Sequence, residues 1–268
     1  MKFSTPVDIA PSQWKIGYED RILMLGSCFV DAIARKMGEY YFRVVSNPTG
    51  TLYNPVSIAR HIGLLDEAEV AVITFGTAWV YEDKRTGQVV DNCQKRPATD
   101  FMRRRMTVDE IVDIWQPILE RYPDKRFVFT VSPIRHVKDG LHENQLSKAT
   151  LLMAIEKLTS LPFREGPGVG SSSYFPSYEI LLDELRDYRF YADDLVHPSS
   201  MAVNYIWERF SETFFSAATT EEMRVLHQLW LDRHHTLLHP DSPEAKAFLE
   251  QLSQRTITLQ KRYSWLQN

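Results

Sequence analysis

The chain has 268 residues, of which 44% are hydrophobic and 25% charged, a composition typical of a soluble globular protein. Its formal net charge of −4 argues against a general nucleic-acid-binding protein, and no run of about 18 apolar residues predicts a membrane span. No apolar signal-peptide core follows Met1, and two cysteines, Cys28 and Cys93, do not make a disulfide framework. We therefore expect a cytoplasmic protein.

Short apolar runs alternate with amphipathic segments from the N-terminus onward. The runs predict strands at 22–25, 42–45, 70–75, 127–131 and 173–175. Between them, apolar residues at helical spacing predict helices at 30–40, 55–65, 108–121 and 143–158. This alternation predicts an α/β fold in which a five-stranded parallel sheet is covered by helices on both faces.

One segment interrupts this alternation after the third strand. Residues 79–83 and 88–92 flank Lys84-Arg85-Thr86-Gly87, which predicts an inserted β-hairpin. The following run Arg103-Arg104-Arg105 is typical of a solvent-exposed turn.

The chain beyond Pro198 is predicted to be helical throughout. Helix starts are expected at Ser199, Thr219 and Ser242, where a capping side chain precedes an amphipathic stretch. We expect residues 1–218 to form the α/β domain and residues 219–268 to form a helical appendage packed on it.

Polar or glycine-bearing segments follow the predicted strands at 26–28, 47–50, 76–79 and 132–136. Ligands bind beyond the carboxyl ends of the strands in open α/β sheets, so these segments are expected to line one crevice. The first of them holds two adjacent nucleophiles, Ser27 and Cys28, in front of a helix whose N-terminus favours a thiolate or an oxyanion. The residues alone leave open which of the two attacks.

Asp194 and His197 are the best candidates for the acid–base half of such a site. Within one tight turn the carboxylate holds the proton on one imidazole nitrogen, and the other nitrogen faces the nucleophile. This pair follows the last predicted strand and precedes Pro198, which keeps His197 out of helical geometry. The same spacing also occurs at Asp139/His142 and at Asp232/His235.

Metal and phosphate sites are weakly signalled. His234, His235 and His239 with Asp232 resemble a zinc cluster in composition, but no Cys-x-x-Cys or His-Glu-x-x-His motif accompanies them. The glycine-rich segment 166–170 lacks the lysine of a phosphate-binding loop. We therefore expect no metal and no cofactor.

The segment Leu25-Gly26-Ser27-Cys28-Phe29-Val30 resembles the signature of the GSCFA family of bacterial proteins, with Val30 where the signature has Ala. Segments 47–55, 76–79, 131–136 and 188–198 resemble the same family. That family is similar to the SGNH, or GDSL-like, hydrolases. The resemblance implies a flavodoxin-like α/β/α sandwich and ester hydrolysis or acyl transfer, with O-acylated carbohydrates among the substrates.

The resemblance also implies roles for individual residues. Cys28 falls on the nucleophile, Asp194 and His197 fall on the Asp–His pair, and Gly50 matches a glycine whose N–H stabilises the oxyanion. Ala78 stands where the superfamily has an oxyanion-binding Asn. Its replacement, or a substrate contact, is expected among Asn54, Thr77, Trp79, Asn92, Arg135 and His136.

Three functional hypotheses follow. In the first, the helix N-terminus and a nearby imidazolium lower the pKa of Cys28 to about 3.5–7.5, so that a thiolate attacks the ester. In the second, Ser27 attacks and Cys28 is a buried filler. In the third, the pocket binds a glycan or an acylated ligand without catalysis, using aromatic residues such as Tyr53, Trp79, Tyr174 and Phe175. The expected partner is a small-molecule or carbohydrate ester, not a nucleic acid or a membrane; the oligomeric state is not predicted.

Overall fold

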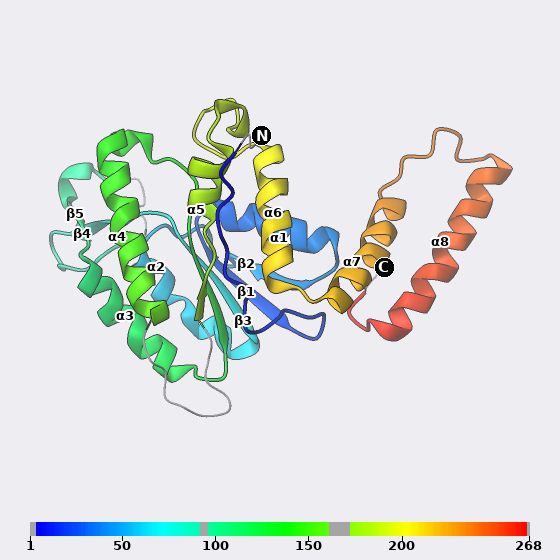
Figure 1. Ribbon diagram of the computed structural model, residues 1–268, viewed down its shortest axis with the longest axis horizontal. Helices are drawn as coiled ribbons and strands as arrows, with labels where there is room; N and C mark the ends of the chain where they lie inside the picture. The colour runs from blue at the N-terminus through cyan, green and yellow to red at the C-terminus, as the bar shows by residue number, and fades with distance from the viewer. Residues whose placement is uncertain (1–3, 92–95, 161–171, 267–268) are drawn as a thin grey trace.

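The computed structural model describes residues 4–91, 96–160 and 172–266. Its centre is a parallel five-stranded sheet in the order β2-β1-β3-β6-β7 (Figure 1). The strands are β1 Arg21–Gly26, β2 Arg43–Ser46, β3 Val70–Phe75, β6 Arg126–Val131 and β7 Ser172–Tyr174. This is the strand order of flavodoxin-like folds, so the predicted α/β sandwich is confirmed.

Side-chain alternation along β1 divides the core into two layers. Ile22 and Met24 pack against α1 and α6 on one face, and Leu23 and Leu25 pack against α2, α3 and α4 on the other. The helices that cover the sheet are α1 Cys28–Glu39, α2 Pro55–Arg60, α3 Val108–Arg121, α4 Leu141–Ser160, α5 Ser177–Glu179 and α6 Ser200–Phe214. The predicted helix 55–65 is divided: α2 ends at Arg60, and a 3₁₀ turn spans Ile62–Glu67.

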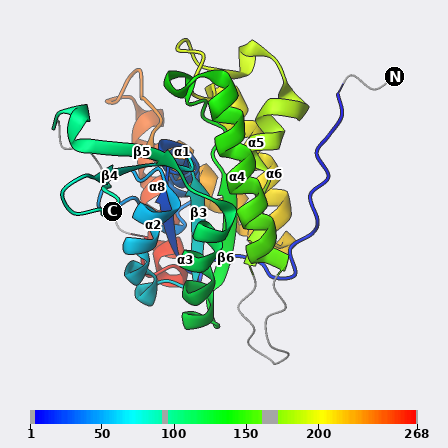
Figure 2. The ribbon, with the colours of Figure 1, turned by 90° about the vertical axis from the view of Figure 1, so that its left-hand side faces the viewer.

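The inserted segment forms a two-stranded arm that differs from the prediction (Figure 2). Strand β4, Trp79–Asp83, pairs along its length with β5, Phe101–Arg105. Toward the described part of the predicted partner it makes one bridge, from Glu82 to Val89, and two backbone hydrogen bonds, from the Asp83 N–H to the Gln88 carbonyl and from the Val90 N–H to the Tyr81 carbonyl. The predicted hairpin therefore forms around the turn at 84–87, but the longer pairing of β4 is with β5, and Val80 and Phe101 of these two strands are buried.

The three arginines are therefore in a strand, and the predicted exposed turn is wrong. Acidic side chains from neighbouring elements account for this. Arg103 pairs with Asp139 at 2.5 Å, Arg104 with Glu82 at 2.6 Å, and Arg105 lies 3.8 Å from Glu143.

Two further helices, α7 Ala217–Arg233 and α8 Pro243–Arg262, extend to one side of the sandwich (Figure 1). Ser199 and Ser242 cap α6 and α8 as predicted, whereas α7 is capped by Ser216 rather than Thr219. Buried residues of α7, Met223, Leu226 and Leu229, join the core layer that contains α1 and α6. Within the described residues, no helix is both long and apolar enough to cross a membrane.

Candidate active site

The turn that ends β1 requires glycine at its first position. Gly26 has a φ of +143°, and a Cβ there would lie 2.1 Å from the carbonyl oxygen of Thr74. The turn continues through Ser27, the N-cap of α1, and Cys28, the first residue of that helix. A side chain at Cys28 is therefore presented at the carboxyl end of the sheet.

Asn47 and Asp31 hold this turn against the end of β2. The Asn47 Oδ1 accepts a hydrogen bond from the Gly26 N–H at 2.9 Å, and its Nδ2 donates to both carboxylate oxygens of Asp31 at 3.1 Å. The Ser46 hydroxyl also donates to Asp31. The first turn of α1 is thus tied to the loop after β2.

The Asp194–His197 segment folds into a turn closed by its own carboxylate. Asp194 Oδ1 accepts the backbone N–H groups of Val196 and His197 at 2.9 Å each, and Oδ2 lies 2.6 Å from the His197 Nδ1. Hydrogen bonds from the backbone and ring of His197, and then from Val196, lower the pKa of Asp194 to about 2. The carboxylate is ionised near neutral pH and favours a proton on Nδ1.

The other ring nitrogen of His197 faces the predicted nucleophile. Its Nε2 lies 3.4 Å from the Cys28 Sγ, so thiol, imidazole and carboxylate form one continuous chain. Arg135 fixes the loop from the side: its backbone N–H donates to the Val196 carbonyl at 3.2 Å, and its Nη1 donates to the Leu195 carbonyl at 3.0 Å.

The electrostatics of Cys28 differ from the expectation of a preformed thiolate. Burial of the half-exposed thiol raises its pKa, and the carboxylates of Asp31 and Asp194 raise it further. The N–H groups of Cys28 and Phe29 act in the opposite direction without outweighing burial. The predicted low pKa is thus wrong in direction, and the resting group is the neutral thiol.

Ser27 points elsewhere. It is 1% exposed, and its hydroxyl donates to the Ser132 hydroxyl at 2.9 Å in the interior. The structure therefore brings Cys28, and not Ser27, to the imidazole of His197.

Several predicted binding residues use their polar groups within the fold. The Gly50 N–H donates to the Asn47 carbonyl at 2.8 Å, so it is not a free oxyanion donor. Asn54 caps α2 through the Ser57 N–H at 2.9 Å. Thr77 Oγ1 lies 3.0 Å from the Ser147 Oγ. These three are explained as structural residues.

Two other predictions fall differently. The Trp79 ring is covered by the Arg103 guanidinium, 3.8 Å from its centroid, so this face is not open for a sugar ring. Asn92 and the glycine-rich segment 166–170 lie outside the described residues.

The rival Asp-x-x-His pairs are occupied by arginines. Asp139 pairs with Arg103 at 2.5 Å, and Asp232 pairs with Arg255 at 2.9 Å. Over the described ranges, no three His, Cys, Asp or Glu side chains gather into a group that would hold a metal ion.

A buried lysine forms the floor beneath these loops. Lys148 of α4 is 1% exposed, and its ammonium donates to the carbonyls of Gly76 and Ser132 at 2.7 Å each, joining the ends of β3 and β6. Burial lowers its pKa to about 7. Sequence reasoning missed it because a lysine on an amphipathic helix is typical of the exposed face.

His136 lies above this floor. Burial, followed by the charge of Lys148, lowers its pKa to about 4, with a smaller contribution from His197. Its edge meets the ring of Tyr53 at a centroid distance of 6.4 Å. His136 is therefore a neutral second imidazole near the thiol–imidazole pair.

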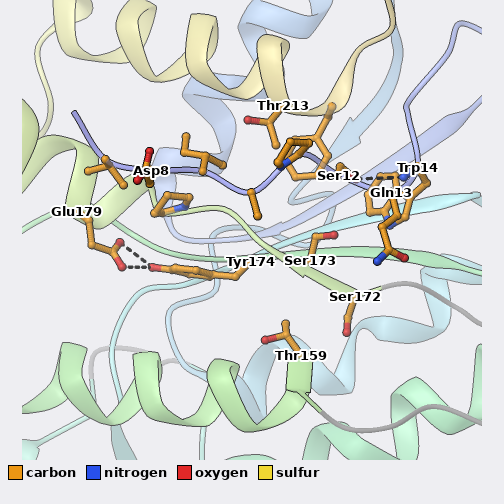
Figure 3. A pocket seen from close by; sticks show the side chains of 16 residues that line it. Asp8, Ser12, Gln13, Trp14, Thr159, Ser172, Ser173, Tyr174, Glu179 and Thr213 are labelled. Carbon is orange, nitrogen blue, oxygen red and sulfur yellow. Dashed lines mark hydrogen bonds between the residues drawn. The ribbon is translucent and has the colours of Figure 1, made fainter.

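A cavity of about 710 Å³ lies between the N-terminal segment and β7, away from these residues (Figure 3). In it the Tyr174 hydroxyl contacts both carboxylate oxygens of Glu179 at 2.8 and 2.6 Å. Of the residues predicted to bind a ligand, Tyr174 lines this cavity, whereas Cys28, Asp194 and His197 do not.

The sequence between β1 and α6 matches the model of the GSCFA family over residues 21–65 and 62–210. The chain belongs to the GSCFA family. The match contains Cys28, Asp194 and His197, and it ends within α6. No curated protein matches this GSCFA protein.

Among solved structures, the GSCFA protein is similar to two mutants of Axe2 from Geobacillus stearothermophilus. One is described as an acetyl-xylooligosaccharide esterase. It is 12% identical to this chain with a TM-score of 0.45, and the matched region covers 75% of this chain and 96% of the esterase chain. The other is described as an acetylxylan esterase. It is 14% identical with a TM-score of 0.42, and the matched region covers 75% of this chain and 97% of that esterase chain. These partial overlaps leave the chemistry to be argued from the side chains of this chain.

Proposed function

We propose that the GSCFA protein hydrolyses an ester, or transfers its acyl group, through the thiol of Cys28. The observation that carries the proposal is the continuous chain from Sγ through the His197 imidazole to Asp194, with separations of 3.4 and 2.6 Å. A nucleophile, a base and a group that orients the base are the three parts of nucleophilic acyl transfer.

The raised pKa of Cys28 makes His197 a general base. As Sγ attacks the acyl carbon, Nε2 accepts the thiol proton and the carbonyl π electrons move to oxygen. Collapse of the tetrahedral intermediate breaks the bond to the alcohol oxygen, which takes the proton from Nε2. The products of this half-reaction are a thioester on Cys28 and a free alcohol.

The second half-reaction reverses these roles. Water, or an acceptor alcohol, attacks the thioester while His197 removes its proton, and the thiol recovers that proton as it leaves. Asp194 remains ionised throughout and stabilises the imidazolium that forms twice in the cycle.

The oxyanion is assigned to the N-terminus of α1. The N–H groups of Cys28 and Phe29 favour the charged form of the thiol, so both lie near Sγ, where the negative oxygen develops. They take the place of Gly50, whose N–H is already bonded, and of the Asn that Ala78 replaces.

Hydrolysis of p-nitrophenyl esters by matched variants tests the proposal. We expect Cys28→Ala to abolish release of p-nitrophenol and Ser27→Ala to retain it. Electrospray mass spectrometry of the wild type after rapid quenching is expected to show one acyl group on Cys28. Full activity in Cys28→Ala would refute the thiol mechanism, and saturable ester binding without turnover in the wild type would refute catalysis.

A further inference from the structure

A second cavity, of about 400 Å³, adjoins the loop that carries Asp194 and His197. It lies between the start of α4 and the segment from α5 to Tyr191. Its lining includes Arg135, Leu141, Asn144, Tyr178, Tyr188 and Tyr191. Its volume is within the range of sites that bind small molecules.

Two lining residues belong to the framework of the proposed site. Arg135 donates to the carbonyls of Leu195 and Val196, one on each side of the turn between Asp194 and His197. Tyr191 forms a β-bridge with Pro198, the residue after His197. A molecule in this cavity therefore lies alongside the loop that holds the base.

The lining combines flat rings with hydrogen-bonding edges. The Arg135 guanidinium lies 5.8 Å from the ring centroid of Tyr188 and 5.3 Å from that of Tyr191, and the two rings are tilted by 48° to each other, so three flat groups border the cavity. The remaining charged side chains are two aspartates and one arginine, so the formal charges of the lining cancel. Such a surface suits an uncharged ring that has an apolar face and hydroxyl groups at its edge.

The chemistry of the leaving group decides which part of an ester occupies it. His197 Nε2 gives its proton to the alcohol oxygen, so the alcohol must depart beside the His197 loop and not beyond α1. We propose that this cavity binds the alcohol part of the ester, a hydroxylated ring such as a sugar. The proposal rests on the proposed function and adds that selectivity is for the alcohol rather than the acyl group.

Tyr188 offers the sharpest test because 63% of its surface is exposed, so its removal leaves the core intact. Two acetyl esters of primary alcohols serve as probes: 6-O-acetylglucose, which carries the ring, and ethyl acetate, which does not. We expect Tyr188→Ala to lower the ratio of kcat/KM for 6-O-acetylglucose to that for ethyl acetate by about tenfold, as loss of a contact to a non-reacting group does. Tyr81→Ala, an exposed tyrosine of β4, is the matched control and is expected to leave the ratio unchanged.

The outcomes separate this proposal from the proposed function. If the wild type hydrolyses both esters and Tyr188→Ala leaves the ratio unaltered, the cavity assignment is overturned and the esterase stands. If the wild type hydrolyses neither ester, binding of 6-O-acetylglucose to wild type and to Tyr188→Ala is compared by saturation-transfer NMR. A signal weakened by Tyr188→Ala supports the cavity while the enzyme proposal fails, and an unchanged or absent signal overturns the cavity too.

Discussion

Replacing Lys148 with methionine is expected to change how the stability of the protein depends on pH, because Lys148 is buried. The folded protein holds the pKa of Lys148 at about 7, against a usual value of 10.5 that we take for the unfolded chain. Between these values the unfolded chain carries a proton that the folded protein lacks. The free energy of unfolding therefore rises with pH over this window, and the stability that Lys148 adds at high pH is lost as the pH falls toward 7.

The size of the effect follows from the shift. Each pH unit inside the window changes the free energy of unfolding by about 1.4 kcal/mol per proton. Between pH 7 and pH 9, the free energy of unfolding of the wild type is expected to rise by about 2 kcal/mol more than that of Lys148→Met. Lost hydrogen bonds to Gly76 and Ser132 shift the variant by a nearly constant amount, so they do not alter this slope.

Urea unfolding of both proteins at pH 7, 8 and 9, followed by tryptophan fluorescence, measures the difference. Lys157→Met is the control, because Lys157 is on the same helix with its side chain 53% exposed and paired with Asp109. If the difference in free energy of unfolding between wild type and Lys148→Met is the same at pH 7 and at pH 9, Lys148 remains protonated in the folded protein and the reasoning fails.

Three further predictions concern the site. Lys148→Met is expected to raise the pKa of His136 from about 4, because a neighbouring positive charge is removed; an NMR titration with no upward movement contradicts this. Asp194→Asn is expected to lower kcat by about 10⁴-fold by stabilising the wrong tautomer of His197, and a loss below tenfold would remove Asp194 from the mechanism. Asp31→Asn is expected to shift iodoacetamide alkylation of Cys28 to lower pH, because the Asp31 charge raises the pKa of the thiol; an unmoved or higher midpoint refutes that coupling.

Hydrophobic pattern was a reliable guide to the three central strands of the sheet, β1, β3 and β6, because almost all of their residues are buried. All six residues of β3, Val70–Phe75, are buried, and the prediction matched its bounds. The hairpin around Lys84–Gly87 was predictable because its turn is a local signal, whereas the pairing of β4 with β5 joins segments that lie further apart along the chain and was missed. A pattern read along a short stretch of sequence does not show which distant segment a strand will pair with.

In the candidate site, too, features set by local sequence were predicted and features set by distant segments were not. Strand ends and turn chemistry predicted the turn at Ser27 and Cys28 and the Asp194–His197 loop, but the choice of Cys28 over Ser27 came from the family resemblance; the structure brings Cys28, His197 and Asp194 together. The functions of Asn54 and Gly50 as a cap and a turn depend on which backbone groups lie within reach. The pKa of Cys28 depends on burial by other segments, and this is why the expected shift had the opposite sign.

The protonation states around Cys28 favour a single proton acceptor. The thiol is neutral, His136 is kept neutral by burial and by Lys148, and Asp194 is ionised and bonded to Nδ1. A charged His136 would oppose formation of the imidazolium on His197, with which it interacts. The low pKa of His136 makes it a weak base, so Nε2 of His197, which lies 3.4 Å from the Cys28 Sγ, is the site that receives the thiol proton.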